Sequence, residues 1–262
     1  MTAATAILSI LCGSLVGLSL GLIGGGGSIL AVPLMAYVVG LPPHAAIGTS
    51  AVAVAASALA NLGGHARART VKWPCALVFA VSGVAGAAFG AQIGKRVDGQ
   101  ALLAAFGVLM VAVAALMLRP RRGGHDPDVR LTRASAARLL PPLAGTGLAV
   151  GALSGFFGIG GGFLIVPGLI SATAMPLLNA IGSSLVSVAT FGATTAVSYA
   201  ASGLVAWRVA GLFIIGGLAG GYAGIEAAKA LALRKRLLAV VFSVVVAVVG
   251  LYVVARGLGH FA

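Results

Sequence analysis

Acidic residues are almost missing from this sequence. Of its 262 residues only four are Asp or Glu, and charged residues of both signs make up 8%. A soluble domain carries about 25% charged residues, so a water-exposed surface is excluded for most of the chain. Apolar runs such as Ala3 to Ile23 and Leu237 to Ala255 exceed the roughly 18 residues that can cross a bilayer. The sequence therefore predicts an all-α polytopic membrane protein.

The scarcity of ionisable groups also excludes several chemistries. The four histidines fall in predicted loops or tails, so the apolar runs hold no ligands for a metal ion, and no cofactor is expected. Cys12 and Cys75 show no metal-binding spacing and suggest no disulfide framework. Ser28 could serve an intramembrane hydrolase as its nucleophile, but no His or Lys of the apolar core offers the base that it would need. We therefore expect no enzyme.

The chain contains two copies of one unit, offset by 134 residues. "GLIGGGGSILAVPLM" aligns with "GFFGIGGGFLIVPGL", and "PPHAAIGTSAVAV" aligns with "PLLNAIGSSLVSV" without a gap. The same offset holds from about Val16 to at least Leu103. We predict a first transmembrane repeat over residues 1–118, an Arg-rich cytoplasmic linker over 119–138, and a second transmembrane repeat over 139–262.

Each repeat divides into five apolar pieces. The second piece of each repeat has only about 12 or 13 residues, which would cover about 20 Å of a hydrocarbon core that is roughly 30 Å thick. Whether these two pieces span or re-enter is left open. The predicted pieces are 3–23, 28–40, 45–62, 74–94, 101–118, 139–157, 162–174, 178–200, 208–229 and 237–255.

The basic residues favour one orientation in the membrane. If all ten pieces cross and both termini face the exterior, 13 of the 17 Lys and Arg lie on the cytoplasmic side and 4 lie outside. The linker then faces anionic lipid, a better partner for it than nucleic acid, because no basic domain could hold a duplex. Five crossings per repeat also invert the second copy, an arrangement that recurs in secondary transporters.

Glycine runs interrupt the first pieces of both repeats at the same place. Backbone N–H groups at such a break cannot be satisfied by lipid, so they must face protein or a water-filled cavity. A helix that starts there directs its positive dipole end at that point, which suits an anion. Each repeat then adds a glycine and two hydroxyls at the start of its third piece. The candidate substrate-binding residues are Gly24, Gly25, Gly26, Gly27, Ser28, Gly48, Thr49, Ser50, Gly158, Gly160, Gly161, Gly162, Gly182, Ser183 and Ser184.

These candidates carry alternative interpretations. Glycine clusters can serve close helix packing alone, and Ser or Thr within a helix often bonds a carbonyl one turn back. If the two hydroxyl pairs meet across a pseudo-twofold axis, four helix ends would converge on one point. Glu226, with Lys229 one turn on, is the one candidate for proton coupling, although Gln92 stands at the equivalent place in the first repeat. A solvated ion pair is the expected role of Glu226.

The doubled glycine-then-proline motif resembles the TauE/SafE family of sulfite exporters. The resemblance rests on "GLIGGGGSILAVPLM" with "AIGTSAVAV" and on their second copies. It implies a secondary transporter that moves small sulfur-containing anions, such as sulfite or sulfonates, across the bacterial inner membrane. An anion channel and a non-transporting membrane scaffold or assembly factor are the alternatives. A homodimer is one of the assemblies that the sequence leaves open.

The orientation gives a first testable prediction. On a background that lacks Cys12 and Cys75, Ser135→Cys should resist a membrane-impermeant thiol reagent in intact cells and react after the membrane is opened, because the linker is predicted to be cytoplasmic. Labelling of Ser135→Cys from outside intact cells would reverse the assignment.

Overall fold

The structure is a computed structural model that describes residues 3–23, 25–118, 131–159, 162–230 and 235–258. Every regular element in these ranges is helical, which confirms the all-α class. The elements are α1 (Ala3–Ile23), the 3-10 turn η1 (Gly25–Leu30), α2 (Ala31–Pro33), the π-helical turn η2 (Leu34–Val38), α3 (Pro43–Arg67), α4 (Trp73–Gly94), α5 (Gly99–Leu118), α6 (Arg133–Phe157), α7 (Gly162–Thr173), α8 (Leu177–Ala200), α9 (Trp207–Ala230) and α10 (Lys235–Leu258).

Within the described residues, seven helices are long and apolar enough to cross a membrane. They are α1, α3, α4, α5, α6, α8 and α10. Large apolar side chains at helical spacing face outward, for example Ile7, Leu11 and Leu15 of α1, each more than half exposed. An outward apolar stripe is costly in water and favourable in lipid. The molecule is therefore an integral membrane protein.

The two short pieces form as predicted. In the first repeat, η1, α2 and η2 follow one another without a gap, so Ser28–Val38 is one short apolar segment with a tight first turn and a widened last turn. In the second repeat, α7 contains 12 residues. Neither segment reaches the length of about 20 residues that a spanning helix requires.

The helix that follows the linker starts earlier than the apolar pattern indicates. Thr132 and Ser135 form a capping box, in which each side chain accepts a hydrogen bond from the other's backbone N–H, and α6 begins at Arg133. The end of the segment 119–138 is therefore helical. Residues 119–130 lie outside the described residues.

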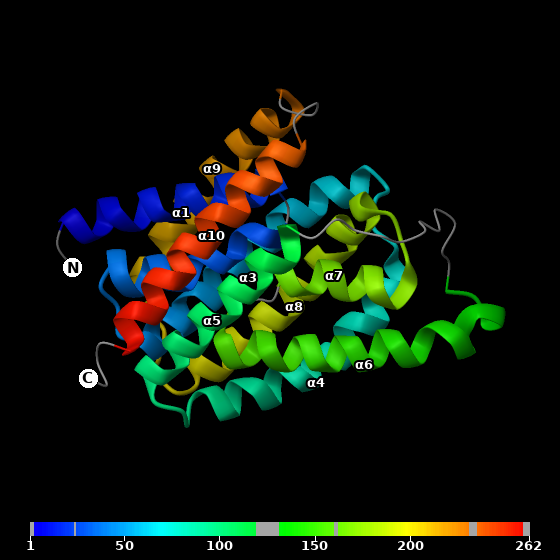
Figure 1. The fold of residues 1–262 in the computed structure, drawn as a ribbon, viewed down its shortest axis with the longest axis horizontal. Helices are drawn as coiled ribbons and strands as arrows, with labels where there is room; N and C mark the ends of the chain where they lie inside the picture. The colour runs from blue at the N-terminus through cyan, green and yellow to red at the C-terminus, as the bar shows by residue number, and fades with distance from the viewer. Residues whose placement is uncertain (1–2, 24, 119–130, 160–161, 231–234, 259–262) are drawn as a thin grey trace.

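The two repeats exchange helices. The first helix of each repeat packs along the fourth helix of the other, so α1 contacts α9 and α6 contacts α4. Figure 1 shows these two pairs at opposite edges of the molecule, with α3 and α8 between them. In addition, α5 packs on α10. Every one of these contacts crosses from one repeat to the other.

Glycines bring the exchanged helices into backbone contact. A Cβ atom on Gly86 would lie 2.2 Å from the Leu148 carbonyl oxygen, and one on Gly220 would lie 2.0 Å from the Ser14 oxygen. Both contacts join residues that are equivalent under the 134-residue offset. Gly90 and Gly224, one turn further on, approach the opposite backbone in the same way. These repeated glycines serve close helix packing.

The central pair, α3 and α8, runs antiparallel. The position of a Cβ on Gly48 is close to Tyr199, whereas that of a Cβ on Gly192 is close to Ala51 and Ala55. Later residues of α3 therefore contact earlier residues of α8. These two helices are also the most enclosed of the seven candidate spans, with 61% and 67% of their apolar windows buried. They form the centre around which the other helices pack.

A second prediction follows from the glycine contacts. Gly90→Ala should lower the melting temperature of the purified protein, because its Cβ would lie 2.0 Å from the Ala152 carbonyl oxygen and the helices would have to separate. Overpacking of this kind costs about 1–3 kcal/mol. Gly145→Ala is the matched control, since no atom lies within 4 Å of that added Cβ. An equal melting temperature for both variants would contradict the packing role.

Candidate functional site

The glycine break of the second repeat is formed around Gly158, which ends α6. Its φ of 68° and ψ of 22° place it in the left-handed region, and its N–H donates to the Ser154 carbonyl. A Cβ at this position would lie 2.0 Å from Cγ2 of Ile47. Glycine is therefore required both by the backbone conformation and by the neighbouring repeat. The short helix α7 then begins at Gly162, which is buried.

The break in the first repeat is described in part. Gly25, Gly26 and Gly27 form the start of η1, and Ser28 in the same turn is fully buried. η1 contacts α7 and α8, so this break also lies where the repeats meet. Three of the predicted glycines, Gly24, Gly160 and Gly161, lie outside the described residues.

A hydroxyl from one repeat reaches the break of the other. Ser50 of α3 donates either to the Ile47 carbonyl of its own helix, at 2.9 Å, or to the Gly158 carbonyl, at 3.2 Å. Its counterpart Ser184 of α8 donates to the Ile181 carbonyl at 2.8 Å. We call the group formed by Gly158, Ile47 and Ser50 the Gly158 half-site. Because Ser50 and Gly158 belong to different repeats, this half-site requires both.

The other two predicted hydroxyls hold loops in place. The Ala206 N–H donates to Thr49 Oγ1 at 3.0 Å, and the Lys72 N–H donates to Ser183 Oγ at 2.9 Å. Each donor immediately precedes the fourth helix of its repeat. The two bonds are equivalent under the 134-residue offset. Thr49 and Ser183 thus attach each repeat to the loop of the other. The sequence pattern showed the recurrence of the hydroxyls and gave no sign of these partners.

The adjoining glycines, Gly48 and Gly182, leave room for the same two loops. A Cβ on Gly48 would lie 2.3 Å from the Leu204 carbonyl oxygen, and one on Gly182 would lie 2.6 Å from Thr70 Oγ1. The Thr70 carbonyl also accepts a hydrogen bond from Asn179 Nδ2 at 2.9 Å. The glycine-and-hydroxyl motif is therefore a docking surface for a loop of the opposite repeat.

The two hydroxyl pairs do not meet at one point. Because α3 and α8 are antiparallel, Ser50 lies beside the part of α8 between Gly192 and Tyr199. Ser184 precedes Gly192 by eight residues, which is about 12 Å along a helix. The predicted site is thus divided into the Gly158 half-site and a second half-site around Ser184, one toward each end of the α3–α8 contact.

Glu226 lies apart from these residues. Its side chain is exposed in the last part of α9, whereas the hydroxyls of both half-sites are fully buried. Among the described residues, no group of three or more His, Cys, Asp or Glu could hold a metal ion.

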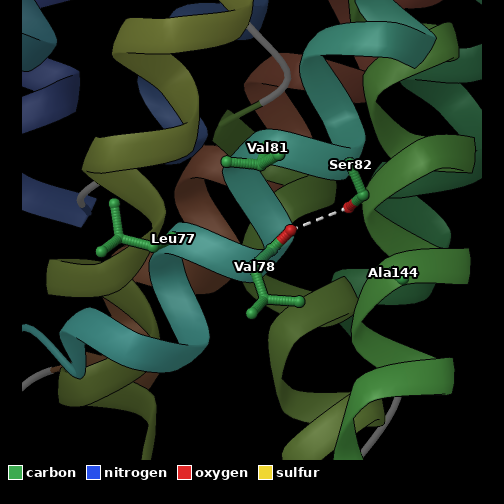
Figure 2. A pocket seen from close by; sticks show the side chains of 5 residues that line it. All are labelled: Leu77, Val78, Val81, Ser82 and Ala144. Carbon is green, nitrogen blue, oxygen red and sulfur yellow. Dashed lines mark hydrogen bonds between the residues drawn. The ribbon is translucent and has the colours of Figure 1, made fainter.

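A surface groove of about 390 Å³ lies between α4 and α6. Figure 2 shows that Leu77, Val78, Val81 and Ser82 come from α4 and that Ala144 faces them from α6. The hydroxyl of Ser82 donates to the Val78 carbonyl at 3.0 Å, and Val81 is 72% exposed. The groove is thus open and apolar, and the one hydroxyl that lines it is already bonded to its own helix.

The docking of the loops gives a third prediction. Gly48→Ala should destabilise the protein more than Gly182→Ala, because the first Cβ meets a backbone carbonyl and the second meets a rotatable side chain. Thr70→Ala should restore part of the loss in Gly182→Ala and none of the loss in Gly48→Ala. Melting temperatures of the single and double variants measure this coupling. Equal effects of Thr70→Ala on both backgrounds would refute the assigned contacts.

This sequence is similar to a family of membrane proteins and to several individual relatives. The family described as "Sulfite exporter TauE/SafE" matches residues 9–253. A "Probable membrane transporter protein" of Xylella fastidiosa (strain 9a5c) is 50% identical over 257 residues, which cover 98% of this chain and 97% of the relative. The "Probable membrane transporter protein YunE" of Bacillus subtilis (strain 168) is 27% identical over 270 residues, with 96% and 98% covered.

A third relative comes from an archaeon. The "Probable membrane transporter protein MJ0441" of Methanocaldococcus jannaschii is 28% identical over 184 residues, with 68% of this chain and 66% of the relative covered. No solved structure matches the chain significantly. Because the family match extends over nearly the whole sequence, the chain belongs to the TauE/SafE family and is a membrane transporter.

Proposed function

We propose that this protein is a secondary transporter of small anions at the bacterial inner membrane, with sulfur-containing oxyanions such as sulfite or a sulfonate as its substrates. The single observation that carries the proposal is the buried glycine break at Gly158, covered by Ile47 and Ser50 of the other repeat. The family's description supplies the sulfur-containing class.

The electrostatics of the core favour an anion that is held by neutral groups. The buried polar side chains of the described residues are hydroxyls of Ser and Thr, together with that of Tyr199, and none of them is charged. The first N–H groups of a helix lack partners within that helix, and its dipole places positive potential there. In α7 this start, at Gly162, is buried directly after the break. An anion near it would be stabilised without a basic side chain.

The two half-sites suggest how access alternates. Ser50 and Ser184 lie toward opposite ends of the antiparallel α3–α8 pair, and the half-site around Ser50 is formed by both repeats. A rocking motion of one repeat against the other would open one half-site while it closes its counterpart, as in other transporters with inverted repeats. We propose that the anion's gradient or the membrane potential drives this cycle, and that Glu226 has no essential part in it.

The fourth prediction concerns the affinity for sulfite, measured by calorimetric titration of the purified protein. A hydrogen bond to a charged group contributes about 1.5–3 kcal/mol, so Ser50→Ala and Ser184→Ala should each raise the dissociation constant about tenfold. From the sequence pattern alone, Gly26→Val and Gly160→Val should raise it further, because valine disfavours the backbone conformations that a run of glycines provides. Gly211→Ala is the control, since its Cβ would have open space.

Sulfite uptake into sealed liposomes that contain the purified protein tests the function itself. Failure of the unmodified protein to move sulfite, methanesulfonate or acetate would contradict the transporter proposal and favour a scaffold. Sulfite currents with a unitary conductance in planar bilayers would contradict alternating access and favour a channel.

A further inference from the structure

Three fully buried hydroxyls near the Gly158 half-site have no hydrogen-bond partner among the described residues. They belong to Ser154 of α6 and to Thr195 and Tyr199 of α8, and each side chain is 0% exposed. Most hydroxyls of the protein do have partners; Thr194, beside Thr195, donates to the Thr190 carbonyl at 2.8 Å. A buried polar group without a partner is costly and requires an explanation.

The Tyr199 hydroxyl lies beside the end of α4. A Cβ on Gly94 would lie 3.2 Å from the Tyr199 hydroxyl oxygen and 2.6 Å from the Phe156 carbonyl oxygen, so the phenol group lies near the end of α6. Phe191 lies two turns before Tyr199 on α8, and its ring packs against Gly83 of α4. Thr195 is one turn from each, on the same stripe of the helix.

Ser154 lies at the level of Thr195. A Cβ on the next residue, Gly155, would lie 2.0 Å from the Ala87 carbonyl oxygen, and Ala87 is one turn beyond Gly83 on α4. Thr195 is likewise one turn beyond Phe191, the residue that contacts Gly83. Ala87 and Ala91, the α4 residues at this level, are small and fully buried.

The cluster adjoins the glycine break on one side and a cation on the other. The Ser154 carbonyl accepts the hydrogen bond from Gly158 that closes the end of α6. Beyond Tyr199, the ammonium group of Lys95 donates to the Ser198 carbonyl at 3.2 Å and to Ser202 Oγ at 3.1 Å. Lys95 directly follows Gly94, so a positive charge lies at the outer end of the row of hydroxyls.

We propose that the hydroxyls of Ser154, Thr195 and Tyr199 form a binding subsite for a small oxyanion within the Gly158 half-site, which the anion reaches past Lys95. This inference rests on the proposed function and extends its site by three residues. Three neutral donors match an anion that spreads one charge over several oxygens, such as a sulfonate, hydrogen sulfite or a carboxylate. They would also release it readily, because none of the three groups carries an opposite charge.

The other repeat does not reproduce this subsite. The equivalent positions hold Leu20, Asn61 and His65. The amide of Asn61 donates to the Ser57 carbonyl at 2.9 Å, and Nδ1 of His65 is 2.9 Å from Thr70 Oγ1. Leu20 offers no donor. The subsite thus belongs to one half-site, and the two ends of the transport path bind the anion differently.

The fifth prediction tests the subsite with the full-length protein purified in detergent and titrated with sulfite. Tyr199→Phe, Thr195→Val and Ser154→Ala should each raise the dissociation constant about tenfold, since each removes one hydrogen bond to an anion and little volume. The melting temperature without sulfite should stay equal or rise, because each change removes an unpaired buried hydroxyl. Thr194→Val is the matched control and should leave the affinity for sulfite unchanged.

The outcomes separate the subsite from the transport function. If the unmodified protein binds and transports sulfite and the three variants bind it with unchanged affinity, the subsite is refuted and the proposed function stands. If Tyr199→Phe lowers the melting temperature at unchanged affinity, its hydroxyl serves the fold and the subsite is likewise refuted. If the unmodified protein neither binds nor transports sulfite, methanesulfonate or acetate, the proposed function fails and the subsite fails with it.

Discussion

Lipid provides no hydrogen-bond partner for a peptide group, and the rest of this structure follows from that constraint. A chain that interrupts its helices in a membrane must cover the interruption with other parts of the protein. Here the cover for each repeat is the other repeat. The carbonyl of Gly158 accepts from Ser50, and the N–H groups of Lys72 and Ala206 donate to Ser183 and Thr49. The non-helical backbone of each repeat thus depends on hydrogen bonds from the other repeat.

The same constraint gives the glycines two separate tasks. At Gly158 the residue is needed for its left-handed backbone. At Gly86, Gly90 and their counterparts, the missing side chain lets two helices touch along their backbones. In both cases the backbone of one repeat contacts the other repeat. At Gly158 this contact lies at a helix break, and at Gly86 and Gly90 it lies along the length of a helix pair. Substitutions at the two kinds of glycine would therefore disturb different features, the left-handed turn in one case and the contact between two helices in the other.

Much of the fold can be predicted from the sequence, because the apolar runs give the lengths of the helices and the 134-residue offset gives the repeat. The bounds of the apolar pieces agree with the helices to within a few residues at most ends. The early start of α6 is an exception, since the capping box of Thr132 and Ser135 lies in a stretch that reads as polar linker.

The partners in the site are harder to predict. An internal repeat shows that Thr49 corresponds to Ser183, but it does not show which residue touches either. Tyr199 and Thr195 give no repeat signal at all, because they have no equivalent of the same type in the first repeat. Their special property is the lack of a partner, which no pattern of residue types records.

Because α1 and α6 are exchanged between the repeats, neither repeat has a complete packing arrangement of its own. A single unit on its own would leave the glycine face of its fourth helix without the helix that covers it, and its own first helix without a place to pack. Two separate units could satisfy both needs only by trading those helices with each other. Joining both units in one chain keeps these exchanged contacts together, because each unit's first helix then always has the other unit's fourth helix to pack on.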